Sequence, residues 1–240
     1  MTFLAKIQKF IILLIVIFNS KISAQFAKVI DNDGYVNVRS DANIKSKVIG
    51  KIKSNEIVYI FNDGDEFGNW LIVDYYVTKD SLLTGYIHNS RVKPISSYQN
   101  IPSILKTKNR AEFSSQKIQV KINIENFDNE KNKIYFKTFQ YTKYAIQTFK
   151  GQEIWGTDGT IPRTHYKSIE VKIGENTILI PQSELENLFN PNCEFTECYY
   201  DEKSRKLYIT SMNSDGSGAY EVLFVIANEK YNGRKIYQAN

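Results

Sequence analysis

Few residues in this chain could act as nucleophiles or hold a metal ion. It contains two cysteines, Cys193 and Cys198, and two histidines, His88 and His165. Covalent catalysis by a thiol needs a base and an orienting group, and neither cysteine stands on a recognisable strand-to-helix elbow. Zinc would require all four of these side chains in one place. The sequence therefore predicts no catalytic residue, no metal site and no cofactor.

The N-terminus has the features of an export signal. Lys6 and Lys9 precede an uninterrupted apolar run, Phe10–Phe18, and the small residue Ala24 follows. The run is about half the ~20 residues that a membrane-spanning helix needs. We expect residues 1–24 to be a cleaved signal peptide and the protein to be exported, to the periplasm or beyond the cell. The alternative is an uncleaved signal anchor.

Two consequences follow for the partners. No cysteine lies near the predicted cleavage site to carry a lipid, so no stable membrane anchor is expected after cleavage. Removal of Lys6, Lys9 and Lys21 lowers the formal net charge from +5 to +2. A nearly neutral chain without a clustered basic face is not typical of a nucleic-acid-binding protein.

Export also affects the interpretation of the cysteines. In an oxidising compartment a pair is more often a disulfide than a metal site. Cys193 and Cys198 are five residues apart, which is ~17 Å in a straight strand, whereas bridged Cα atoms are ~5–6 Å apart. The bridge therefore requires residues 194–197 to turn. A disulfide and two free thiols are the alternatives.

Most of the chain is predicted to be β-structure. From Ala27 to Ile95, strands of four to six residues alternate with turns about every ten residues, a pattern typical of a small barrel. Within this segment the residues Val36-Asn37-Val38-Arg39-Ser40, then Val48-Ile49-Gly50, Trp70 and Gly85-Tyr86-Ile87 follow in order. The segment from about 27 to 96 thereby resembles a bacterial SH3-like domain. The hairpin before Gly85 is longer than is usual in that family.

The resemblance implies a binding module. SH3-type barrels bind peptides in aromatic-lined grooves, so the candidate ligand-binding residues are Tyr35, Arg39, Trp70 and Tyr86. The area that an indole buries favours a core position for Trp70. Arg39 could either contact a ligand carboxylate or lie over the barrel edge.

The remainder is predicted to be a linker and a second domain. Residues 97–116 are polar and read as a linker, although Ile101, Ile104 and Leu105 could dock as a short helix. Residues 117–240 are predicted to be a β-rich meander domain. A single short helix is expected over Pro181–Phe189, where Ser183 and Glu186 have capping-box spacing.

One loop of the second domain is a candidate binding loop. It runs from Trp155 to Arg163, and Trp155 would supply apolar contact while Asp158 or Arg163 orients the partner. The alternative is a turn in which Asp and Gly satisfy backbone requirements. Trp155–Gly159, Asn213–Tyr220 and Tyr231–Arg234 give this half a resemblance to an uncharacterised domain of exported bacterial proteins.

The sequence thus predicts an all-β protein that binds without catalysing a reaction. Its SH3-like domain would bind a cell-wall peptide or an envelope protein, and its C-terminal domain would dock a protein partner. An immunity-type protein that neutralises a toxin and a cell-wall hydrolase are the two alternatives. No nucleic-acid partner is expected.

Overall fold

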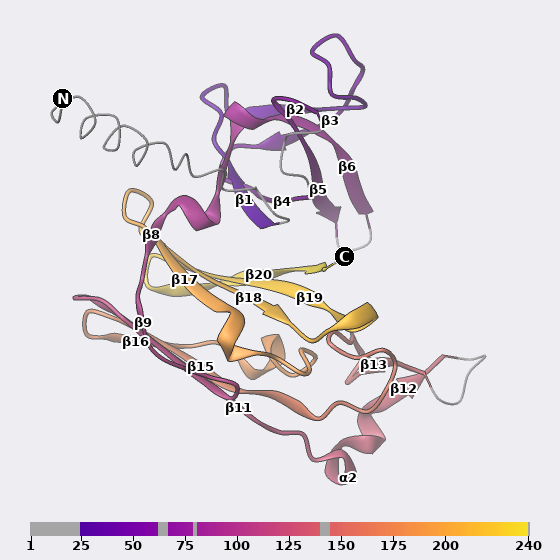
Figure 1. Cartoon of the computed structure of the whole chain (residues 1–240), viewed down its shortest axis with the longest axis vertical. Helices are drawn as coiled ribbons and strands as arrows, with labels where there is room; N and C mark the ends of the chain where they lie inside the picture. The colour runs from indigo at the N-terminus through magenta and orange to yellow at the C-terminus, as the bar shows by residue number, and fades with distance from the viewer. Residues whose placement is uncertain (1–24, 62–66, 79–80, 140–144, 240) are drawn as a thin grey trace, which may run out of the picture.

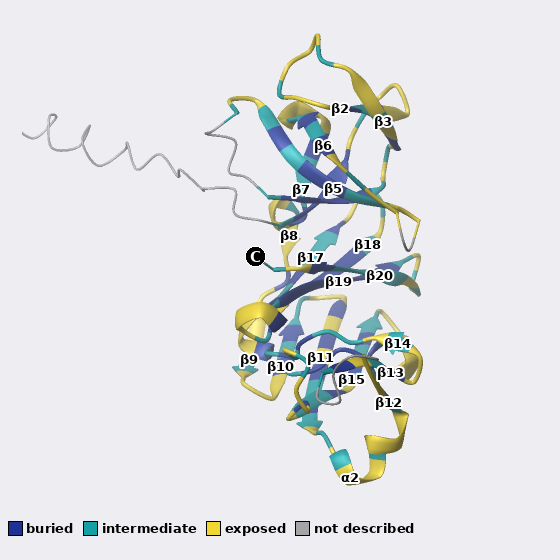
Figure 2. Ribbon diagram, turned by 90° about the vertical axis from the view of Figure 1, so that its right-hand side faces the viewer, coloured by how far each residue is buried: buried dark blue, intermediate teal, exposed yellow. Residues whose placement is uncertain are grey.

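A computed structural model describes residues 25–61, 67–78, 81–139 and 145–239. The predicted signal peptide, residues 1–24, lies outside these residues. Figure 1 and Figure 2 show three tiers: a curled sheet at the N-terminal end, a middle sheet beneath it, and a further sheet below. The predicted all-β fold with a barrel-like first domain is confirmed. Among the described residues, no helix has the length and apolar character needed to cross a membrane.

The N-terminal sheet curls into a half-barrel. Its seven strands lie in the order β3-β2-β6-β5-β4-β1-β7, with bounds β1 Gln25–Val29, β2 Tyr35–Arg39, β3 Val48–Lys53, β4 Ile57–Ile60, β5 Trp70–Thr78, β6 Ser81–His88 and β7 Val92–Pro94. Alternation buries Val36 and Val38 of β2 and leaves Tyr35 exposed and Asn37 and Arg39 half-buried. The core on the concave side consists of Ala, Val, Ile and Leu side chains.

The C-terminal part packs two five-stranded antiparallel sheets face to face. The middle sheet has the order β20-β19-β18-β17-β8, with β8 Gln99–Asn100, β17 Thr196–Asp201, β18 Lys206–Asn213, β19 Tyr220–Ala227 and β20 Lys230–Gln238. The lower sheet has the order β16-β15-β11-β10-β9, with β9 Ser103–Thr107, β10 Arg110–Ser114, β11 Ile118–Asn126, β15 Thr164–Ile173 and β16 Asn176–Leu179.

The middle sheet is covered on both faces, and the sequence of β19 shows this, because all of its residues but Glu221 are apolar. Tyr220, Val222, Phe224 and Ile226 point into the core between the two C-terminal sheets. The alternate residues Leu223 and Val225 face the half-barrel instead. Because a strand buried on both faces needs apolar side chains at consecutive positions, β19 has a continuous hydrophobic run from Val222 to Ala227 rather than an alternating pattern.

The half-barrel and the middle sheet share an aromatic interface. Phe26 and Tyr59 of the half-barrel pack with Tyr208 and Tyr237 of the middle sheet. The Tyr59 and Tyr237 rings stack with centroids 4.8 Å apart. Beside them the Lys28 ammonium and the Asp201 carboxylate form an ion pair of 2.6 Å, with both side chains less than a tenth exposed. The two parts are therefore in extensive contact.

The segment predicted to be a linker is corrected by the structure. Within 97–116 lie β8, β9 and β10, and β10 pairs with both β9 and β11. Ala111 and Phe113 are buried on one face of β10, while Arg110 is exposed. This alternation spans only the five residues of β10, and the residues around it are mostly polar, so the sequence does not indicate a strand there.

The predicted helix is also misplaced. Over Pro181–Phe189 the structure has only the 3-10 turn η4, Gln182–Glu184. The backbone there instead forms hydrogen bonds with Trp155: Trp155 N donates to Asn187 O, and Phe189 N donates to Trp155 O. Among the described residues, the single α-helix is α2, Asn129–Asn132. The remaining elements are β12 Phe136–Thr138, β13 Ile146–Phe149, β14 Gln152–Glu153 and the 3-10 turns η1 Asn89–Arg91, η2 Ile95–Ser97, η3 Lys133–Tyr135, η5 Cys193–Phe195 and η6 Gly216–Gly218.

Candidate functional site

A groove of about 150 Å³ lies on the outer surface of the half-barrel. Its walls come from the outward face of β2, the start of β5, the end of β6 and the turn before β2. Three of the predicted ligand-binding residues, Tyr35, Arg39 and Trp70, line it. The strand alternation that buries Val36 and Val38 is what directs Tyr35 and Arg39 outward into the groove.

The aromatic wall of the groove is built by strand pairing. Trp70 and His88 are direct partners across the β5–β6 ladder, and their rings meet edge to face with centroids 5.5 Å apart. Trp70 is partly exposed, so the core position favoured from its size is wrong. Tyr35 is 40% exposed, and the Lys51 ammonium lies 4.1 Å from its ring centroid. The groove thus offers two large aromatic side chains to a ligand.

The polar wall carries charges of both signs. Arg91 Nη1 and Asp31 Oδ2 form an ion pair of 2.8 Å. Arg39 Nη1 donates to the backbone oxygen of Ser46 at 2.7 Å, which fixes its guanidinium in place. Asp33 is exposed, and its backbone N–H donates to Asp31 Oδ1. A ligand that carries both a carboxylate and an amine would find a partner for each.

Sequence reasoning missed part of this groove. His88 and Asp33 line the groove but are not among the predicted ligand-binding residues. The register of β5 with β6 places His88 opposite Trp70, and Arg91 reaches the groove from η1. Because His88 follows Tyr86 by two residues, strand alternation places both side chains on the same face of the sheet. Only the pairing of β5 with β6 shows that Trp70 is the neighbour of His88. Tyr86 itself packs against Phe67 and does not line the groove.

The candidates of the C-terminal loop do not meet in one site. Asp158 Oδ1 accepts a hydrogen bond from Ser217 Oγ at 2.8 Å, which ties the loop to η6. Gly156 has a φ of +88°, and a Cβ there would lie 1.9 Å from Phe189 O. Arg163 is exposed, and its backbone N–H donates to Asn190 Oδ1. These contacts favour the alternative, a structural turn. Of the three candidates Trp155, Asp158 and Arg163, only Trp155 lines a second cleft, which also includes Arg234 and is described below.

The cysteines lie in the core between the two C-terminal sheets. Cys193 and Cys198 are both free and fully buried, so the structure lacks the predicted disulfide. Cys198 faces inward from β17 and Cys193 from the turn η5, where each packs as a small apolar residue. Burial raises the pKa of the Cys193 thiol to about 12 and that of Cys198 well above its usual value. Such thiols are unreactive.

Comparison with known proteins agrees with the half-barrel. Residues 26–93 match the family model of the bacterial SH3 domain. This segment is therefore a bacterial SH3 domain, as the motif around Val36–Ser40 indicated, and the C-terminal part is not assigned to a family. No curated protein and no solved structure matches the chain.

Proposed function

We propose that this protein is an exported binding protein without catalytic activity, and that its SH3 domain holds a cell-wall peptide in the groove described above. Bacterial SH3 domains are commonly cell-wall binding modules. The observation that carries the proposal is the convergence of Tyr35 and Trp70 with Asp33 and Arg39 in one groove.

The chemistry of the groove suits a peptide of this kind. Cell-wall peptides carry both free carboxylates and amines. Arg39 and Arg91 can bind the former and Asp33 the latter, while the aromatic rings of Tyr35 and Trp70 contact aliphatic stems. Since Arg91 and Arg39 already have protein partners, they are held in position before a ligand arrives, which lowers the entropy cost of binding.

The test is sedimentation of the purified protein with cell-wall sacculi. Aromatic side chains at a binding hot spot contribute ~2 kcal/mol or more, so Tyr35→Ala and Trp70→Ala should each weaken binding about 30-fold. Tyr135→Ala is a matched control, because Tyr135 is similarly exposed and also lies beside a lysine, Lys150, but belongs to the C-terminal part. It should leave binding unchanged.

Two results would contradict the proposal. Unchanged sacculus binding in both groove variants would place the site on another surface. Release of soluble wall fragments by the wild-type protein would show catalysis. We expect neither, and the second measurement needs only chromatography of the supernatant from the same sedimentation experiment.

A further inference from the structure

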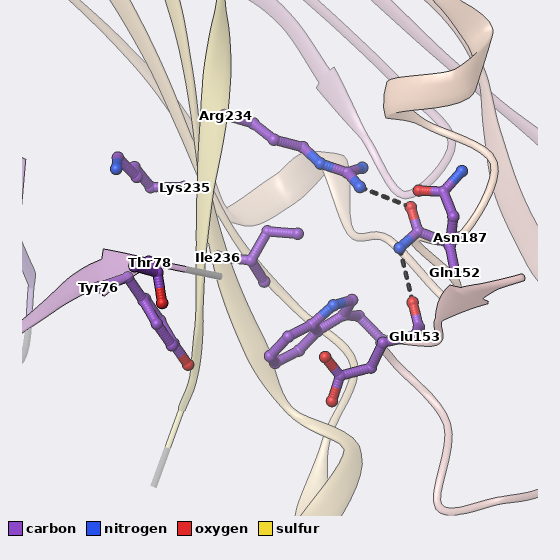
Figure 3. A pocket seen from close by; sticks show the side chains of 9 residues that line it. Tyr76, Thr78, Gln152, Glu153, Asn187, Arg234, Lys235 and Ile236 are labelled. Carbon is purple, nitrogen blue, oxygen red and sulfur yellow. Dashed lines mark hydrogen bonds between the residues drawn. The ribbon is translucent and has the colours of Figure 1, made fainter. Parts of the chain in front are cut away.

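A second cleft, of about 450 Å³, lies where the SH3 domain meets the C-terminal part. Figure 3 shows Tyr76 and Thr78 on one side of it and Gln152, Glu153 and Asn187 on the other, with Ile236 of β20 between them. Tyr76 and Thr78 belong to the β5–β6 hairpin. The SH3 domain therefore supplies one wall of the cleft and the C-terminal part supplies the other.

The C-terminal wall of this cleft is held rigidly. The Arg234 guanidinium donates to Glu184 O and, at 2.8 Å, to Asn187 Oδ1. Asn187 Nδ2 in turn donates to the backbone oxygen of Glu153 at 2.6 Å. Trp155 is fixed by backbone hydrogen bonds to residues 187 and 189, and its side chain is partly buried against the core. Such a wall is pre-organised for a ligand.

The cleft combines an aromatic surface with charges of both signs. Trp155 is half-buried and Tyr76 is half-buried, so part of each ring faces the cleft. Glu153 is exposed and brings a carboxylate, whereas Lys235 brings an ammonium group. Arg234 is largely neutralised by Glu184, whose Oε2 lies 3.5 Å from Arg234 Nε. Because Glu153 and Lys235 carry opposite charges, the cleft favours neither an anion nor a cation over a neutral ligand.

An uncharged ligand with many hydroxyl groups fits both the aromatic surface and the two oppositely charged side chains of this cleft. A hydroxyl both donates and accepts hydrogen bonds, so it can donate to Glu153 and accept from Lys235. A pyranose ring also has an apolar C–H face that can lie on an indole or phenol ring. The cleft volume is within the ~300–1,000 Å³ typical of small-ligand sites. We infer that this cleft binds a short neutral oligosaccharide, with Trp155 as the stacking platform and Glu153 as the acceptor.

Tryptophan fluorescence provides a site-specific test. The chain has two tryptophans, so Trp70→Phe leaves Trp155 as the single indole reporter. We expect the emission of that protein to change saturably on titration with chitotriose or maltotriose, two neutral probes. A response to chitotriose alone would narrow the ligand to acetamido sugars.

Variants of the acceptor and the opposite wall sharpen the test. In the Trp70→Phe background, Glu153→Gln keeps the side-chain shape and should weaken saccharide binding about tenfold, because it removes a charged acceptor. Tyr76→Phe should weaken it less. Glu130→Gln is the matched control, since Glu130 lies on α2 at the far end of the molecule from the SH3 domain (Figure 1).

The inference fails on any of three results. These are no saturable change with either saccharide, equal affinity in Glu153→Gln, and a response to a charged dipeptide in place of the saccharides. The outcome is separate from that of the sacculus experiment, because the reporter lies in a different cleft and the Trp70 side chain of the SH3 groove is already removed.

Discussion

The SH3 domain has two aromatic surfaces that differ in what covers them. Its own core is aliphatic. Phe26 and Tyr59 lie on one outer face, where Tyr208 and Tyr237 of the middle sheet pack against them. Tyr35 and Trp70 lie in the groove, and Tyr35 remains 40% exposed. Figure 1 shows β1 and β4, which carry Phe26 and Tyr59, on the side of the half-barrel that faces the middle sheet, and β2 on the far side.

The difference separates aromatic residues that stabilise the fold from those that we propose bind a ligand. An aromatic face that the chain covers itself contributes to stability through buried area. Substitutions on a face that stays exposed change the stability little, but such a face is available to a partner. The three predictions below test this contrast at the covered face, from the largest expected effect to the smallest.

The first change is Tyr237→Ala at the covered face. It removes a ring that stacks on Tyr59 and contacts Phe26 and Tyr76. Loss of a large buried aromatic side chain typically costs ~3–5 kcal/mol, so we expect the free energy of unfolding, measured by urea denaturation, to fall by about 4 kcal/mol. Tyr35→Ala should lower it by less than ~0.5 kcal/mol. Equal losses in the two variants would refute the contrast.

The second change is Lys28→Met, which leaves the buried Asp201 carboxylate without its ammonium partner. Removing one member of a buried ion pair typically costs ~3–5 kcal/mol. Because Asp201 Oδ2 also accepts a hydrogen bond from Ser204 Oγ at 2.5 Å, we expect a loss near the low end, about 3 kcal/mol in urea denaturation. The double variant Lys28→Met with Asp201→Leu should recover most of it. A double variant no more stable than the single one would show that the pair is not the cause.

The third prediction concerns pH. Burial raises the pKa of Glu221 from 4.5 to about 7, and the neighbouring Tyr59 hydroxyl lowers it in part. The folded state therefore binds this proton more tightly than the unfolded state. The stability that it provides is complete below about pH 4.5 and is lost as the pH rises through about 7.

Glu221→Gln measures this contribution. Between pH 5 and pH 8 the free energy of unfolding, measured by urea denaturation, should fall with rising pH by about 2 kcal/mol more in the wild type than in the variant. Tyr199, which also lies near Glu221, is neutral throughout this window. A wild-type profile identical to that of the variant would show that Glu221 does not titrate there.

Part of the fold and of the groove could be predicted because the evidence is local. Alternation in Tyr35–Arg39 fixes which side chains face outward, and the motif there is confirmed by the family match. The strands of the C-terminal meander follow from long apolar runs such as 222–227. By contrast, β9 and β10 are short, and one of them has exposed apolar residues, Ile104 and Leu105. The pairing of β9 with β10, and of β10 with β11, carries no local signal.

The sequence by itself determined the SH3 domain, the β-rich class and the outward direction of Tyr35 and Arg39, because a strand alternates its side chains whatever surrounds it. Only the tertiary structure decided what those side chains meet. Strand register placed His88 beside Trp70, the tier beneath the barrel enclosed Tyr59, and backbone pairing with Trp155 replaced the expected helix at 181–189. These are contacts between residues far apart in the chain, and no periodicity encodes them.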